Sequence, residues 1–175
     1  RRRGSGERPV RVAGVVLAVA ISMALQTTLA RFVLRGTVAI DLVLIVVVYV
    51  ALTMGSVAGL LTGAVSGILQ DVLSGGVVGI GGGANTIVGF LAGVASAQFI
   101  VTGTPTRFLV FFGATVVRGV VFMGLYMLLE LRQFASPYAG VGLQALVNGV
   151  IGIGVFQLLE RVPAVVAQRR ASGDR

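Results

Sequence analysis

The chain has 175 residues, of which 56% are apolar and 11% charged, whereas a soluble domain carries about a quarter charged residues. It has no cysteine, which excludes a disulfide framework and a thiolate metal site. A net charge of +8 is compatible with nucleic-acid binding, but the arginines do not line one helix face as such binding would require. They gather beside apolar stretches, which favours binding to an anionic membrane surface instead: Arg1, Arg2, Arg3, Arg8 and Arg11 at the start, and Arg161, Arg169, Arg170 and Arg175 at the end.

Six apolar stretches approach the length of about 20 residues that a membrane-crossing helix needs. They cover residues 12–30, 38–54, 57–73, 84–101, 107–129 and 140–159. The second and third are short and closely joined, so a count of five spans stays open. An arginine-rich start before an apolar stretch is also typical of a signal peptide, but the first stretch is long for a signal core, and we expect a helix.

The predicted fold is therefore all-α: a polytopic membrane bundle of six transmembrane helices in a single domain, residues 1–175. Residues 1–11 and 160–175 are expected to be tails, and residues 12–159 the bundle. Cytoplasmic segments carry an excess of arginine. With both ends in the cytoplasm, ten arginines lie inside and three lie outside, namely Arg31, Arg35 and Arg132. This arrangement requires an even number of spans and favours six.

A four-residue glycine repeat dominates the third stretch and the segment that follows it. It runs Gly55, Gly59, Gly63, Gly67, Asp71, Gly75, Gly79 and Gly83, with Asp71 as its one exception. In water each glycine would cost a helix about 1 kcal/mol relative to alanine. In lipid, small residues at this spacing let helix backbones approach closely. Gly89 and Gly93 repeat the spacing in the fourth stretch, so we expect these faces to pack in the bundle or to dock a partner; a substrate cavity is the weaker alternative.

The segment from Ser74 to Gly83 is predicted to be a flexible loop or a short re-entrant segment. Gly75-Gly76 and Gly81-Gly82-Gly83 should interrupt any helix there. It is not a phosphate-binding loop, because no Lys-Ser/Thr pair follows the glycines.

Polar residues inside apolar spans are the candidate functional residues, because a polar group in lipid is costly. They are Asp41, Gln70, Asp71, Arg118, Gln144 and Asn148. Arg118 lies 11 residues into its span, near the middle of the bilayer, and should face inward. We expect some of Asp71, Asn148, Gln144 and Gln70 to satisfy it. A packing clamp with no wider role is an equal alternative.

Catalysis has few candidate groups in this chain. Histidine, cysteine and lysine are absent, and a nucleophilic serine would need a nearby base. No two carboxylates in or beside the spans are close in sequence, and no metal-ligand cluster occurs. We expect no catalytic residue, no cofactor and no metal.

Several segments together resemble the MreD family, the membrane component of the bacterial rod-shape (elongation) machinery. The resemblance runs over about residues 38–95: Asp41-Leu42-Val43-Leu44, the Gly59-Leu60-Leu61 and Gly63 stretch, the run from Gly67 through Gln70-Asp71 to Gly75, and Val88-Gly89-Phe90-Leu91-Ala92-Gly93. In the family pattern an Asp precedes the second span, and a glycine-spaced third span ends in Asp. Asp41 and Asp71 match those positions, whereas the role of Arg118 is not part of the resemblance.

The resemblance implies a non-enzymatic scaffold in the bacterial cytoplasmic (inner) membrane. MreD-like proteins are thought to bind the single-span protein MreC. Through it they support a complex with RodA, a penicillin-binding transpeptidase and MreB filaments, which directs peptidoglycan synthesis and rod shape.

Two other functions are compatible with the sequence. Substrate-binding subunits of energy-coupling vitamin transporters are six-span proteins of similar size, and the MreD family is similar to them in outline. A vitamin pocket should gather aromatic residues, yet the chain has no tryptophan and three tyrosines. A channel or proton-coupled carrier that uses Asp71 and Arg118 is a third possibility, disfavoured because internal repeats and acidic clusters are absent.

Overall fold

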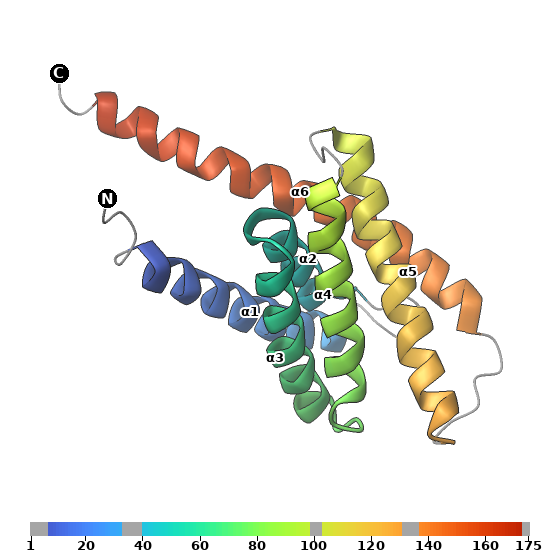
Figure 1. Cartoon of the computed structure of the whole chain (residues 1–175). Helices are drawn as coiled ribbons and strands as arrows, with labels where there is room; N and C mark the ends of the chain where they lie inside the picture. Colours follow the sequence, from blue (N-terminus) through green and yellow to red (C-terminus); the bar gives the residue numbers. More distant parts are fainter. Residues whose placement is uncertain (1–6, 33–39, 99–102, 131–136, 173–175) are drawn as a thin grey trace.

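A computed structural model describes residues 7–32, 40–98, 103–130 and 137–172 (Figure 1). The described residues are helical, so the predicted all-α class is confirmed. The six helices are α1 (Glu7–Phe32), α2 (Leu42–Met54), α3 (Ser56–Ser74), α4 (Ile80–Gln98), α5 (Thr104–Leu128) and α6 (Pro137–Ser172). Each one overlaps one of the six predicted stretches.

Four of these helices contain a segment long and apolar enough to cross a membrane: Ser56–Ser74, Ile80–Gln98, Thr104–Leu128 and Gly140–Glu160. The apolar segments of α1 and α2, Val12–Thr28 and Leu42–Met54, are shorter. Helix α2 has 13 residues and is therefore about 20 Å long, against a hydrocarbon thickness of about 30 Å. That all six helices cross the membrane stays a prediction.

Helix α2 is the centre of the bundle and contacts each of the other five helices. Its sequence, LVLIVVVYVALTM, is apolar on every side, as a helix enclosed by others should be. Its side chains meet the aromatic rings of Phe111 in α5 and Phe156 in α6 in one apolar core. The bundle is thus built around its shortest helix.

Helices α3 and α4 run side by side in opposite directions and are joined by a short turn (Figure 1). Helices α5 and α6 form a second contacting pair. The N-terminal part of α1 and the C-terminal part of α6 extend away from the bundle on the same side (Figure 1).

The prediction that glycines 81 to 83 interrupt a helix is wrong. Helix α4 begins at Ile80 and includes all three, so the loop is only the stretch from Gly75 to Gly79. Both ends of that loop need glycine, because Gly75 (φ 66°) and Gly79 (φ 105°) adopt positive φ angles that other residues rarely take. The helix tolerates the run of glycines because the carboxylate of Asp71 accepts N–H groups of its first turn and helix α3 packs against it.

Polarity is distributed as expected for a protein in lipid, with polar groups inside and apolar side chains outside. Asp41, Ser66, Asn85, Thr115 and Asn148 are all buried. The outer face of α3 exposes Val57, Leu61 and Val65, each by more than half of its surface. A soluble protein rarely exposes so continuous an apolar face, so the outer surface suits acyl chains or a partner helix.

Candidate functional site

Arg118 of α5 lies among helices and bonds to residues of α3 and α4 and to the residue that precedes α2. Its Nη1 lies 3.0 Å from Oδ2 of Asp41, an ion pair in which the two side chains are 16% and 3% exposed. Its Nε donates to Oδ1 of Asn85 in α4 at 2.7 Å. Its Nη2 donates to Oε1 of Gln70 in α3 at 3.5 Å, a long bond. The charge of this arginine is therefore paired inside the protein.

Asp41 directly precedes α2 and serves two roles. Its Oδ1 accepts the backbone N–H of Leu44 at 3.0 Å, which caps the first turn of α2. Its Oδ2 holds Arg118. A carboxylate that is 2% exposed is costly unless it is paired, and these contacts supply both a counter-charge and a hydrogen bond.

Asn148 of α6 connects Asp41 to α5. Its Oδ1 accepts the backbone N–H of Asp41 at 3.1 Å, and its Nδ2 donates to Oγ1 of Thr115 at 3.2 Å. The Thr115 hydroxyl in turn donates to the carbonyl of Phe111. We call the connected set the polar cluster; its members are Asp41, Gln70, Asn85, Thr115, Arg118 and Asn148.

The expected partners of Arg118 need correction. Of the four residues proposed, Gln70 bonds directly to it, and Asn148 reaches it only through Asp41. Gln144 is half-buried one turn before Asn148 and is not among the partners of Arg118 in the described structure. The ion pair instead uses Asp41, because the start of α2 lies deep inside the bundle.

Sequence reasoning missed Asn85 and Thr115. Asn85 carried a usable signal, since it stands four residues after Gly81 and four before Gly89 and so interrupts a second glycine repeat as Asp71 interrupts the first. Thr115 lies three residues before Arg118, on the same helix face.

Asp71 does not pair with Arg118; it caps the start of α4 instead. Its Oδ2 accepts the backbone N–H groups of Gly79 at 2.9 Å, Gly81 at 3.0 Å and Gly82 at 3.2 Å. These belong to the N–H groups that a helix leaves unsatisfied at its first turn, where a negative charge is also favourable. Because α3 ends only three residues later, the carboxylate is within reach of the backbone that follows.

The glycine repeats of α3 and α4 face one another. A Cβ atom at Gly59 or Gly89 would overlap the carbonyl group of the other residue, and one at Gly63 would overlap the backbone of Asn85. One at Gly67 would lie 2.7 Å from the Cα of Gly82. The Gly93 position meets the backbone of Ser56 in the same way. We call this contact the glycine interface; it is occupied by the chain itself.

Gly55 differs from the other glycines of the repeat. No atom would lie within 4 Å of a Cβ there, and its φ angle is 92°. It forms the turn between α2 and α3 and donates its N–H to the carbonyl of Ala51. Its glycine is required by backbone conformation and not by packing.

A sequence model of the family described as rod shape-determining protein MreD matches residues 10–162. The chain belongs to the MreD family. As a member it is a membrane protein with a role in determining rod shape. No curated protein matches the chain, and no solved structure does.

The MreD match extends beyond the resemblance over residues 38–95 and takes in most of α1, all of α5 and much of α6. It therefore includes every member of the polar cluster, Arg118 among them. Nothing in the comparisons supports a vitamin-transporter subunit.

A second ion pair joins α5 to α6 in this MreD-family chain. The guanidinium of Arg107 donates to both carboxylate oxygens of Glu160, at 2.8 and 2.9 Å, and lies 4.1 Å from the ring centre of Phe156. Glu160 is half-exposed, so this pair should contribute little to stability compared with the buried one.

The polar cluster contains one carboxylate, that of Asp41, and no histidine or cysteine. Among the described residues, no group of three or more His, Cys, Asp or Glu could hold a metal ion. The charges of the polar cluster are bonded to one another and to backbone groups. The arrangement is suited to fixing the relative positions of α2, α3, α4, α5 and α6.

Replacing Asp71 with alanine should destabilise the fold by about 1–3 kcal/mol, because buried N–H groups of the α4 start would lose their acceptor. Unfolding of the purified protein in mixed detergent micelles, followed by circular dichroism, measures the loss. Asp71→Asn is the matched control, since its carbonyl can still accept, and it should lose less. Equal stability of Asp71→Ala and the parent would contradict the capping role.

Proposed function

We propose that this MreD-family protein is a non-enzymatic scaffold of the cell-wall elongation complex, and that it binds MreC. Through MreC it would support RodA, a penicillin-binding transpeptidase and MreB filaments in peptidoglycan synthesis. The observation that carries the proposal is the buried polar cluster, in which side chains from α3, α4, α5 and α6 and the residue before α2 bond to one another. A bundle fixed in this way offers partners a defined surface, whereas a carrier must rearrange its helices.

The proposal places six spans in the bacterial cytoplasmic membrane with both ends in the cytoplasm. The placement of arginines supports this orientation, with the arginine-rich tails against anionic lipids. The free ends of α1 and α6, which extend on the same side, agree with it (Figure 1). Helix α2 crosses as a short helix sheltered by its neighbours, since seven of its residues are buried.

The glycine interface is not the surface proposed for MreC. Since α4 covers the glycines of α3, a partner helix would meet the apolar exterior of the bundle. Without a hydrophobic driving force in lipid, such docking depends on close shape fit.

Co-purification tests the scaffold. The tagged protein is extracted from bacterial membranes that also express MreC, and a six-span membrane protein of another family serves as the control at matched expression. We expect MreC to be recovered with the scaffold in a fixed ratio and not with the control. Equal recovery with both proteins would refute specific binding.

A second arm tests the absence of transport. The purified chain in vesicles should neither accumulate nor turn over any solute, and an ATPase pair should not co-purify with it. Saturable uptake, or thermal stabilisation by a vitamin, would favour the transporter alternative.

A further inference from the structure

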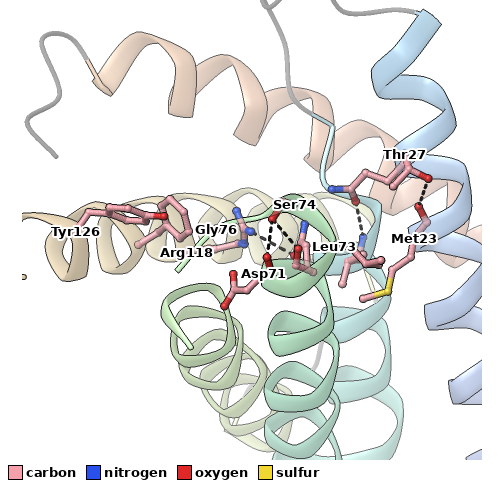
Figure 2. A pocket seen from close by; sticks show the side chains of 12 residues that line it. Met23, Thr27, Asp71, Leu73, Ser74, Gly76, Arg118 and Tyr126 are labelled. Atoms are coloured by element: carbon pink, nitrogen blue, oxygen red, sulfur yellow. Dashed lines mark hydrogen bonds between the residues drawn. The ribbon is translucent and has the colours of Figure 1, made fainter. Parts of the chain in front are cut away.

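A cavity of about 270 Å³ lies between α1, α3 and α5 and reaches the polar cluster (Figure 2). Arg118 and Gln70 line its inner part, and Ser74, Gly76 and Tyr126 line the part near the loop after α3. Tyr126 follows Arg118 by eight positions in α5, so the cavity extends about 12 Å along that helix. Figure 2 shows Arg118 directed toward the end of α3, with Met23 and Thr27 of α1 on the opposite side.

The charges around this cavity nearly cancel. Arg118 is paired with Asp41 behind it, and the carboxylate of Asp71 is bonded to three N–H groups at the start of α4. The N-termini of α2 and α4 each add about half a positive charge. A ligand with a net charge of either sign would therefore find no unbalanced partner.

The walls combine hydrogen-bonding groups with apolar surface. The carboxamide oxygen of Gln26 accepts a hydrogen bond from the N–H of Val43, and its amino group is left to donate to a ligand. An arginine side chain has five N–H donors. Arg118 uses three of them for its bonds within the polar cluster. Leu73 and Phe122 supply apolar lining. Mixed donors, acceptors and apolar walls are typical of sites for small molecules.

We propose that this cavity binds the uncharged, hydroxyl-bearing headgroup of a small amphiphile. The headgroup lies against Gln26, Gln70 and Arg118, and the apolar chain leaves along Leu73 and Phe122 toward lipid. The volume falls just below the range of drug-sized sites, about 300–1,000 Å³, so it suits a single sugar-sized ring. The proposal does not depend on the scaffold role.

Binding of four probes to the full chain in lipid nanodiscs tests the proposal. The probes are octyl glucoside, the cation octyltrimethylammonium, the anion octyl sulfate and free glucose, each below its micelle concentration. We expect saturable binding of octyl glucoside, and at least tenfold weaker binding of both charged amphiphiles and of glucose. Equally tight site binding of a charged probe would overturn the neutral headgroup. Equally tight binding of glucose would overturn the amphiphile.

Blocking variants locate the site. A Cβ at Gly76 would lie 3.7 Å from the Ser74 hydroxyl and 3.8 Å from both the Asp71 carbonyl and the Tyr126 hydroxyl, which are ordinary contact distances. Gly76→Phe should therefore narrow the cavity and weaken the binding of octyl glucoside at least tenfold. Thr27→Trp should likewise narrow the cavity from the opposite wall and weaken the binding of octyl glucoside. It provides a second test if Gly76→Phe does not fold. Gly124→Phe, at an exposed position of α5 with no atom within 4 Å, is the matched control. Equal weakening by the control, or none by either blocking variant, would overturn the proposal.

Discussion

Replacing Arg118 with leucine should destabilise the protein by about 3–5 kcal/mol, the cost of removing one partner of a buried ion pair. The substitution would leave the Asp41 carboxylate, 2% exposed, without its counter-charge. It would also remove a donor from Asn85 and from Gln70. Unfolding titrations of the purified protein in mixed micelles measure the loss.

A double variant separates the ion pair from general packing. Asp41→Asn with Arg118→Leu removes both charges but keeps an oxygen that can cap α2, so it should be more stable than Arg118→Leu alone. Glu160→Gln, which breaks the half-exposed pair with Arg107, serves as the control and should cost less than about 1 kcal/mol. If Arg118→Leu were as stable as the parent, the polar cluster would not hold the helices together.

Replacing Gly63 with alanine should destabilise the protein by about 1–3 kcal/mol, the usual penalty for overpacking, and leucine should prevent folding. The direction of this change in stability is informative, because alanine in a helix is ordinarily favoured over glycine by about 1 kcal/mol. At Gly63 the added methyl would overlap the backbone of Asn85 and push α3 away from α4.

Gly154→Ala is the matched control, since no atom lies within 4 Å of a Cβ there and the residue is exposed on α6. It should be neutral or stabilising. The variants are compared by their detergent-extracted yield, by whether they elute as a single species, and by thermal unfolding. Equal behaviour of Gly63→Ala and Gly154→Ala would show that α3 and α4 do not approach as closely as the glycine interface requires.

Features confined to one helix could be predicted from the sequence. The apolar runs located all six helices, because burial in lipid requires about a helix length of apolar residues whatever surrounds them. The four-residue spacing of Gly59, Gly63 and Gly67 likewise indicated close packing, since it places these residues near one another on a helix surface. The family resemblance over residues 38–95 agreed with the match to MreD.

The choice of partners was decided by the tertiary structure alone. Asp41 and Asp71 are both acidic and both stand near a helix end, yet one pairs with Arg118 and the other caps α4. The rise per residue of a helix predicts how deep each residue lies along the membrane normal, but it does not predict how each helix is rotated about its own axis. That rotation is set by the glycine interface and by the packing of α2, and it determines which carboxylate faces the arginine.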